Sequence, residues 1–166
     1  MANAVLLAGG NLGNREKLLS DARKLILKDL GKIKKKSSIY ETQPWGFNNA
    51  PYFLNQAVEI ETKLDPEELL CKILEIEKKL GRERAEYGKS RYTSRKMDID
   101  IIFYDRKIIK KENLKIPHPR LHKRRFVLAA LKEIIPDFVH PEYTKENYTI
   151  TRLYKKCNDP SEVYLY

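Results

Sequence analysis

The sequence predicts a single α+β domain, and three observations lead to this prediction. First, 166 residues of which 42% are hydrophobic fit one compact core. Second, short apolar or alternating segments, which are typical of strands, are separated by two amphipathic helical segments. Third, no repeat, low-complexity tract or linker-like change of composition divides the chain. We therefore expect residues 1–166 to form one domain.

The first half of the chain is expected to contain three strands and one helix. These are a strand at Ala4–Ala8, a helix from about 15 to 28, a strand at Ile33–Tyr40, a loop over Thr42–Pro51 and a strand at Phe53–Thr62. Asn14 can cap the helix and Gly31 can end it. The run Lys34–Lys36 indicates an exposed sheet edge. The segment Ala8–Gly13 is interpreted as a tight turn, because the chain is too short for a six-stranded dinucleotide-binding domain.

The second half is expected to add a helix, a strand and a helical extension. In chain order these are a helix opened by Asp65-Pro66-Glu67-Glu68 and ended by Gly81, a basic loop from Arg82 to Lys96, a strand at Asp98–Tyr104, a hairpin arm at Lys107–Ile109, a helix at Lys123–Ile135, and a strand and a short helix in the tail. The resulting βαββαβ order predicts a ferredoxin-like antiparallel sheet with both crossover helices on one face. The later helix can cover the other face, which gives an α/β/α sandwich.

Composition limits the classes of partner and the compartment. The chain has 33 Lys and Arg against 23 Asp and Glu, a formal net charge of +10. This balance favours anionic partners such as nucleic acid, acidic membranes or ATP, although charge alone is better explained by an ordinary solvated surface. Cys71 and Cys157 lack any ligand-like spacing and are expected to be free thiols. With no signal-peptide pattern and no bilayer-spanning apolar stretch, we expect a cytoplasmic protein.

The strand predicted at Asp98–Tyr104 places the carboxylates of Asp98 and Asp100 on one face, because side chains alternate along a strand. The same alternation places Ile99, Ile101 and Phe103 on the other face. Neighbouring carboxylates repel unless a cation lies between them, and hard oxygen ligands suit Mg²⁺. A bare Asp-x-Asp pair is more often a solvated polar face. A cluster of basic residues just upstream favours triphosphate binding here instead. Its members are Arg82, Arg84, Lys89, Arg91, Arg95 and Lys96.

A second cluster follows Pro117-His118-Pro119, which forces an extended approach to the next helix. Lys123, Arg124 and Arg125 then lie near the helix N-terminus, where the helix dipole disfavours cations. An anion bound at that end would offset this cost. Taken alone, the pattern is more typical of a solvated basic turn in which His118 makes a local hydrogen bond.

A third cluster runs from Glu41 to Phe47 and continues at Tyr52–Asn55. It contains the only tryptophan, Trp45, in a segment without periodicity. Aromatic faces together with an amide suit a flat heteroaromatic ligand, which Asn55 can bond along one edge. The alternative is that Trp45 folds back against the sheet as part of the core.

These clusters, in this order, resemble the 6-hydroxymethyl-7,8-dihydropterin pyrophosphokinase family over about Val5 to Phe138. The most specific match is Arg95-Lys96-Met97-Asp98-Ile99-Asp100, which has the family's R-x-x-D-[LIV]-D pattern. Further matches are Tyr40–Gly46 with Phe53–Asn55, Glu77 ahead of Gly81–Arg84, and Pro117–Pro119 ahead of Arg124 and Phe126. The chain departs from the family at Gly10, where a serine is usual, and in a longer loop between Arg84 and Arg95 that carries Tyr92 in place of a common tryptophan.

The resemblance implies a monomeric transferase of folate biosynthesis that moves diphosphate from ATP to the hydroxymethyl group of 6-hydroxymethyl-7,8-dihydropterin and releases AMP. It implies that Asp98 and Asp100 hold two Mg²⁺ ions. The implied catalytic residues are Arg82, Arg84, Arg95, Asp98 and Asp100. The implied ATP-binding residues are Glu77, Arg82, Arg84, Arg95, Ile101, His118 and Arg124. The implied pterin-binding residues are Thr42, Pro44, Trp45, Phe53, Asn55 and Phe126.

Two other classes of function share some of these features. A nucleic-acid-binding module would also combine a ferredoxin-like sheet with a basic surface, but the sequence has no RNP-like aromatic strand. The face carrying Asp98 and Asp100 would also repel a polyphosphate unless metal were present. A metal-binding or regulatory domain without catalysis is the second alternative, and turnover of ATP with Mg²⁺ separates it from an enzyme. We expect small-molecule substrates and neither nucleic acid nor membrane as partners.

Overall fold

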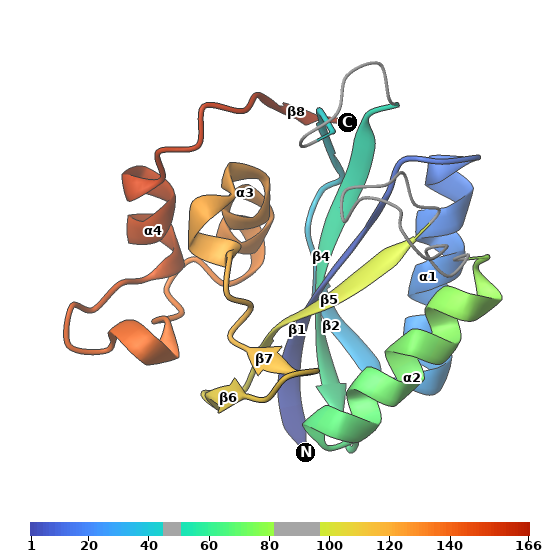
Figure 1. Ribbon diagram of the computed structural model, residues 1–166, viewed down its shortest axis with the longest axis horizontal. Helices are drawn as coiled ribbons and strands as arrows, with labels where there is room; N and C mark the ends of the chain where they lie inside the picture. Colours follow the sequence, from blue (N-terminus) through green and yellow to red (C-terminus); the bar gives the residue numbers. More distant parts are fainter. Residues whose placement is uncertain (45–50, 82–96) are drawn as a thin grey trace.

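The computed structural model describes residues 1–44, 51–81 and 97–166, and it confirms the predicted α+β class (Figure 1). The strands are β1 (Ala2–Gly10), β2 (Lys32–Lys36), β3 (Tyr40–Thr42), β4 (Phe53–Thr62), β5 (Asp98–Tyr104), β6 (Ile109–Lys110), β7 (Lys115–Ile116) and β8 (Val163–Leu165). The helices are α1 (Arg15–Asp29), α2 (Pro66–Lys79), α3 (Arg125–Ile134) and α4 (Ile150–Lys156), with 3-10 turns at Leu121–Lys123 and Pro141–Tyr143. Among these described residues, no helix has the length and apolar character needed to cross a membrane.

The main sheet is antiparallel, with β1 and β4 at its centre. Its strand order is β5-β1-β4-β3-β8, and β2 pairs with another part of β4. The predicted strand Ile33–Tyr40 is thus two strands, because the chain leaves the ladder at Ser37. There the Ser37 hydroxyl accepts a bond from the Ala57 backbone N–H at 3.0 Å, and Gln56 donates to the Ser37 carbonyl at 2.7 Å. The predicted hairpin arm at Lys107–Ile109 lies slightly later, where β6 pairs with β7 in a separate ribbon.

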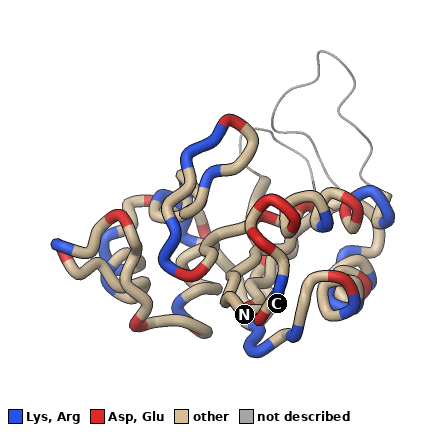
Figure 2. Tube along the Cα trace, turned by 90° about the horizontal axis from the view of Figure 1, so that it is seen from below, with Lys and Arg blue, Asp and Glu red and all other residues tan. Residues whose placement is uncertain are grey.

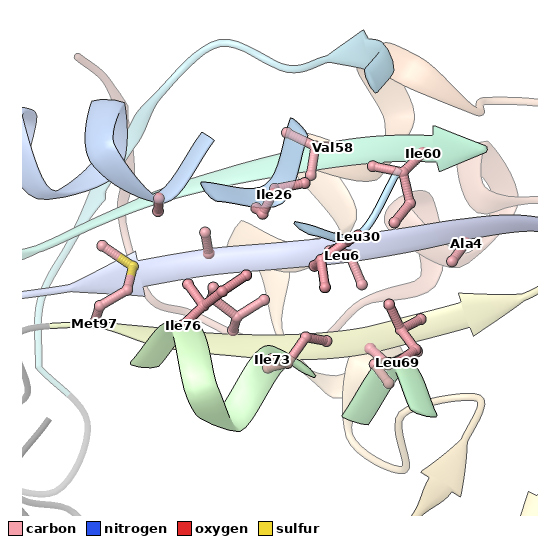
Figure 3. Close-up of a cluster of buried hydrophobic side chains, with 14 of the residues drawn as sticks. Ala4, Leu6, Ile26, Leu30, Val58, Ile60, Leu69, Ile73, Ile76 and Met97 are labelled. Atoms are coloured by element: carbon pink, nitrogen blue, oxygen red, sulfur yellow. The ribbon is translucent and has the colours of Figure 1, made fainter. Parts of the chain in front are cut away.

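Helices α1 and α2 cover one face of the main sheet, and α3 and α4 lie against the other (Figure 1). The first layer is closed by a cluster of buried side chains shown in Figure 3. Leu6 of β1 and Ile60 of β4 meet Ile26 of α1 and Ile73 of α2 there, and all four are fully or almost fully buried. A second cluster joins Val5, Leu7 and Ala57 to the apolar faces of α3 and α4. Burial on both sides fixes the strands in register, because a slip by one residue would exchange the two faces.

The helix signals in the sequence are confirmed by the cap contacts. The Asn14 side chain accepts a bond from the Lys17 backbone N–H at 3.1 Å. Asp65 and Glu68 form a reciprocal capping box at the start of α2. Gly31 follows α1 where the chain passes close to β4, and a Cβ there would lie 2.1 Å from the Glu61 carbonyl oxygen. The chain therefore needs glycine at this position.

The alternation of β5 breaks at a β-bulge that the sequence did not reveal. Val5 pairs with Phe103 but Leu6 pairs with Ile101, so Ile102 is the extra residue. Phe103 was expected on the same face as Ile99 and Ile101, and this was wrong. The bulge turns it to the opposite face, where its ring lies 4.7 Å from that of Phe138.

Charged residues are spread over the described elements. In the view of Figure 2, basic and acidic positions are interspersed along the trace. Several form ordinary surface ion pairs, such as Lys17 with Asp21 at 2.6 Å on α1 and Lys110 with Glu142 at 2.8 Å. Exposed pairs of this kind contribute little to stability.

His140 should make the fold sensitive to acid. It is 2% exposed, its Nδ1 accepts a bond from the Glu142 backbone N–H at 3.1 Å, and its ring lies 5.7 Å from that of Phe103. Burial lowers its pKa from 6.5 to about 4, an effect that nearby Glu142 opposes and His122 adds to. Between these two pKa values the unfolded chain binds the proton more tightly than the folded protein does. We therefore expect the contribution of His140 to the free energy of unfolding to be fully present above pH 6.5 and to be lost as the pH falls towards 4.

We expect this group to account for a loss on the order of 2–3 kcal/mol between pH 7 and pH 4. Urea unfolding at pH 7, 5.5 and 4.5 measures it. His140→Asn keeps an acceptor for the Glu142 N–H and should be less stable than the wild type at pH 7. Its free energy of unfolding should, however, change less between pH 7 and pH 4.5 than that of the wild type. An unchanged difference would contradict the assignment.

Candidate active site

A cleft of about 770 Å³ lies beside the sheet, on the face that α3 covers. Its walls come from β1, β3, β4 and β5, from the β6–β7 hairpin and from the start of α3. Nine of the candidate residues line it together: Thr42, Phe53, Asn55, Asp98, Asp100, Ile101, His118, Arg124 and Phe126. Segments up to 84 positions apart in the chain, from Thr42 to Phe126, therefore meet in one place.

The remaining candidates are placed differently. Pro44 is described and partly buried, but it does not line the cleft. Glu77 is buried behind β5. Trp45, Arg82, Arg84 and Arg95 lie outside the described residues, as does the predicted loop between Arg84 and Arg95.

The floor of the cleft is a row of three residues across the sheet. Gly9 of β1 pairs with Asn55 of β4 on one side and with Asp98 of β5 on the other. Residues paired directly across antiparallel strands point to the same face, and neighbouring strands lie about 4.8 Å apart. The Asn55 amide and the Asp98 carboxylate therefore open into the same cleft, with backbones roughly 10 Å apart. Between them Gly9 presents no side chain.

The lack of a side chain at Gly9 is a steric requirement. A Cβ there would lie 2.4 Å from the Asn55 Oδ1 and 3.1 Å from the Leu54 carbonyl oxygen. Both contacts are shorter than normal packing, so the amide of Asn55 occupies the space that a side chain on β1 would take. The turn predicted at Ala8–Gly13 was wrong for Gly9, which lies within β1 and shapes the cleft.

The acidic side of the cleft is formed by Asp98 and Asp100. Both are partly exposed and line the cleft, as the alternation of the predicted strand required. The His118 Nε2 lies 4.0 Å from the Asp100 Oδ2, beyond hydrogen-bonding distance. His118 itself is held beside β5 by a bond from its backbone N–H to the Ile102 carbonyl at 3.0 Å.

His118 is neutral at pH 7 in this site. Burial, followed by the positive charges of Arg124 and Arg120, lowers its pKa from 6.5 to about 4. Its Nδ1 accepts a bond from the Arg120 backbone N–H at 3.2 Å, which leaves the ring proton on Nε2. This nitrogen lies 4.0 Å from the Asp100 Oδ2, so its proton could be donated to a ligand on the acidic side of the cleft.

The other side of the cleft combines an amide with two aromatic rings. Asn55 and Thr42 are each 5% exposed, and the Asn55 Nδ2 donates to the Thr42 hydroxyl at 3.2 Å. Phe53 and Phe126 are half-buried and line the cleft from β4 and α3. The arrangement suits a flat ring that stacks on aromatic faces and bonds along one edge.

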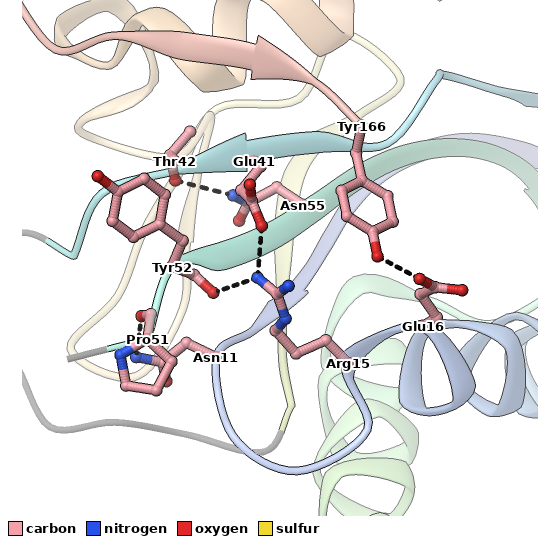
Figure 4. A network of polar contacts seen from close by, with 9 residues as sticks. All are labelled: Asn11, Arg15, Glu16, Glu41, Thr42, Pro51, Tyr52, Asn55 and Tyr166. Atoms are coloured by element: carbon pink, nitrogen blue, oxygen red, sulfur yellow. Dashed lines mark hydrogen bonds and ion pairs between the residues drawn. The ribbon is translucent and has the colours of Figure 1, made fainter.

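A polar network holds this side of the cleft against α1 (Figure 4). The Arg15 guanidinium donates to the Glu41 carboxylate at 2.7 Å and to the Tyr52 carbonyl at 2.8 Å. The Asn11 amide donates to the Pro51 carbonyl at 3.0 Å. Arg15 thus bridges the residues that precede Thr42 and Phe53. No local pattern in the sequence marks Arg15, because its partners are 26 and 37 positions away.

Glu77 supports the acidic pair from behind. It is 2% exposed, and its Oε1 accepts a bond at 2.8 Å from the backbone N–H of Ile99. Ile99 lies between Asp98 and Asp100, so this bond fixes the part of β5 that carries both carboxylates. The resemblance implied that Glu77 is an ATP-binding residue, and its bond to β5 places it directly behind the acidic pair.

The cleft also contains residues that no sequence pattern indicated. Leu70 of α2 lines it, as do four residues of the β6–β7 hairpin: Glu112, Asn113, Leu114 and Lys115. Over the described ranges, no group of three or more His, Cys, Asp or Glu is arranged to hold a metal ion. Mg²⁺ commonly takes only one or two carboxylates together with substrate phosphates, so the Asp98–Asp100 pair still fits this ion.

Comparison with known proteins gives one consistent family. The profile described as 7,8-dihydro-6-hydroxymethylpterin-pyrophosphokinase matches residues 5–136. The 2-amino-4-hydroxy-6-hydroxymethyldihydropteridine pyrophosphokinase of Aquifex aeolicus is 41% identical over 146 residues, which are 87% of this chain and 88% of the relative. The folate synthesis bifunctional protein of Arabidopsis thaliana is 42% identical over 79% of this chain and 26% of its own length.

A solved structure agrees in fold. The crystal structure of Plasmodium falciparum HPPK-DHPS with SDX-DHP aligns with a TM-score of 0.73 at 22% identity. The alignment covers 94% of this chain and 43% of that one, so this chain spans less than half of the chain in that structure.

We expect the Glu77 carboxylate to be required for stability. Glu77→Ala leaves the Ile99 N–H buried without this acceptor, which should cost about 1–3 kcal/mol. Glu77→Gln retains an acceptor oxygen and should cost less. Glu75→Ala, on the exposed side of the same helix, is the control. Urea unfolding measures all three, and equal stability of Glu77→Ala and Glu75→Ala would contradict the role.

Proposed function

The chain belongs to the 7,8-dihydro-6-hydroxymethylpterin-pyrophosphokinase family, and from this premise we propose how its cleft performs the reaction. The enzyme is a pyrophosphokinase of folate biosynthesis that transfers diphosphate from ATP to the hydroxymethyl group of 6-hydroxymethyl-7,8-dihydropterin. The observation that carries the proposal is the composition of the cleft. An aromatic and amide side adjoins a side with two carboxylates, a neutral histidine and two arginines, Arg120 and Arg124.

The aromatic side is proposed to bind the pterin. Phe53 and Phe126 would stack on the two faces of its ring, and Asn55 would bond its edge. Support comes from the position of Asn55, whose amide is held by Thr42 and confined by Gly9. Pro44 and Trp45 are proposed to contribute at the rim, as the family resemblance implies.

The charged side is proposed to bind ATP. Arg124 would pair with phosphate oxygens, and the Nε2–H of His118 would donate to one of them. Ile101 would lie beside the adenosine. Arg82, Arg84 and Arg95 are proposed as further phosphate ligands and, with Asp98 and Asp100, as catalytic residues. Glu77 is proposed to act on the ATP-binding side indirectly, through its hydrogen bond to the backbone of β5.

Asp98 and Asp100 are proposed to hold two Mg²⁺ ions. Two carboxylates on one strand face, opening into a cleft that also holds basic residues, are a suitable donor set for a hard cation beside a triphosphate. When bound, Mg²⁺ offsets negative charge on the triphosphate and on the transferred group.

The residues of the chain then act mainly by positioning. The pterin hydroxymethyl oxygen attacks the β-phosphorus of ATP in line, a new oxygen–phosphorus bond forms, and the bond to the α-phosphate oxygen breaks to release AMP. The aromatic walls and Asn55 aim the hydroxymethyl group, while Arg124 and His118 hold the phosphates against the acidic side. No described residue of the cleft is assigned as a general base.

We infer a ferredoxin-like βαββαβ unit within an α/β/α sandwich, supported by β1 lying between β4 and β5 and by helices on both faces of the sheet. We also propose that the enzyme works as a cytoplasmic monomer on small molecules, without nucleic acid or membrane partners. Incubation with ATP, Mg²⁺ and the pterin should release AMP, and failure to form the pterin diphosphate would overturn the function.

We expect Asp98→Ala and Asp100→Ala to fold and to lose nearly all turnover. Each carboxylate is partly exposed, so its loss should change the unfolding free energy by about 1 kcal/mol or less. Binding of ATP should lose its dependence on Mg²⁺. Asp98→Asn and Asp100→Asn should behave like the alanine variants, because a neutral oxygen is a weaker ligand for a hard cation. AMP release and calorimetric ATP titration with and without Mg²⁺ measure this.

Asp137→Ala, at an exposed acidic position elsewhere, is the matched control and should keep wild-type turnover. Wild-type activity of both alanine variants at limiting Mg²⁺ would rule out the metal role.

A further inference from the structure

The tail from Cys157 to Tyr166 touches both walls of the aromatic side of the cleft. It lies beyond residues 5–136, the part that matches the family. After α4 it passes the start of α3 and crosses to the edge of the main sheet, where it forms β8 (Figure 1). The tail therefore connects the element carrying Phe126 with the strand carrying Thr42.

Its first contact is a carboxylate at the N-terminus of α3. The residue at the N-cap, Arg124, makes no capping bond with its side chain. Instead the Asp159 Oδ2 accepts a bond at 3.0 Å from the backbone N–H of Arg125, which is the first residue of the helix. A carboxylate stabilises this end of a helix by satisfying an N–H and opposing the dipole. The anion expected at this helix end is thus partly supplied by the chain itself.

The side chain of Arg125 also bonds the tail, in addition to its backbone N–H. The Arg125 Nε donates to the Asp159 carbonyl at 3.0 Å, and its Nη2 donates to the Cys157 carbonyl at 2.9 Å. Asp159 is 7% exposed, and its Oδ1 also accepts a bond from the Ser161 N–H at 2.9 Å. Burial would raise the pKa of this carboxyl, but the bonds from Ser161 and Arg125 outweigh it and lower the pKa, so the group is ionised at pH 7.

The second contact is a strand pairing. Val163 of β8 pairs with Thr42, and Tyr164 pairs with Glu41. The Tyr166 backbone N–H donates to the Ile39 carbonyl at 2.9 Å, and its hydroxyl bonds Glu16 on α1 (Figure 4). These bonds attach the end of the tail to β3, directly beside the wall that holds Asn55.

We propose that Asp159 is a positioning residue that sets the distance between Phe126 and the Phe53–Asn55 wall, and so the affinity for the pterin. Phe126 directly follows the N–H that Asp159 holds, and a ring must fit between two aromatic faces at van der Waals distance. A shift of the first turn of α3 would open this gap. On the phosphate side only Arg124, the N-cap residue, would move with this turn. Asp98 and Asp100 lie on β5 and His118 is bonded to it, so ATP binding should be affected less.

The inference rests on the proposed function, and the experiment separates the two. The experiment measures the KM of the pterin, the KM of ATP, kcat and thermal unfolding. It compares the wild type with Asp159→Ala, Asp159→Asn and Thr149→Ala. Thr149 accepts the Arg152 N–H at 3.2 Å and caps α4, so Thr149→Ala removes a similar helix cap outside the cleft. Asp159→Asn keeps an acceptor oxygen and should partly restore the wild-type values.

Asp159→Ala is expected to raise the KM of the pterin roughly tenfold, the scale of a weakened stacking contact, with the KM of ATP within about twofold. Thr149→Ala should lower thermal stability without this split. An unchanged pterin KM in Asp159→Ala, or equal increases for both substrates, would overturn the inference. If wild type formed no AMP, the proposed function itself would fail.

A second variant keeps the test decisive if Asp159→Ala does not fold. Removing residues 163–166 deletes β8 and releases the other end of the tail from β3. It should also raise the pterin KM selectively. Wild-type values for both substrates would overturn the inference.

Discussion

At Gly9 the central strand pairs with Asn55 on one side and Asp98 on the other, and the rest of the cleft depends on this pairing. The register places an amide and a carboxylate on the same face, one strand away from Gly9 in each direction. Because Gly9 has no side chain, the Asn55 amide can lie over β1 and the floor between the two groups stays open. Helices α1 and α2 bury the opposite face of these strands and so fix the register.

Support for this row comes from polar groups buried behind it or beside it. Glu77 bonds the backbone of β5 between the two acidic residues, and Arg15 joins the strands that carry Thr42 and Phe53. Asp159 holds the start of α3 on the opposite wall. Each of these polar side chains is at least partly withdrawn from solvent, so its hydrogen bonds specify one arrangement of the backbone. The floor and walls of the cleft are therefore held in place by residues that do not line it.

Local patterns predicted the elements that carry the site. Strands β4 and β5 have the predicted bounds, and the capping box at Asp65 marked the start of α2, because alternation and caps are properties of neighbouring residues. The bulge that turns Phe103 depends on pairing with β1, and the break at Ser37 depends on side-chain bonds to β4. Contacts made by Glu77, Arg15 and Asp159 span 22 or more positions, which no local pattern encodes. The acidic pair was recognisable because both members lie on one strand.

The most direct test of the account is Gly9→Ala, with Ala8→Gly on the opposite face of the same strand as the control. The added Cβ would displace the Asn55 amide, from which it would lie 2.4 Å, while the pairing with Asp98 need not change. Calorimetric titration with the pterin, in the presence of a non-hydrolysable ATP analogue and Mg²⁺, should show affinity at least roughly tenfold weaker, equivalent to about 1.4 kcal/mol. Binding of the ATP analogue should be nearly unchanged. Wild-type pterin affinity in Gly9→Ala would contradict the claim that this row of residues forms the floor of the site.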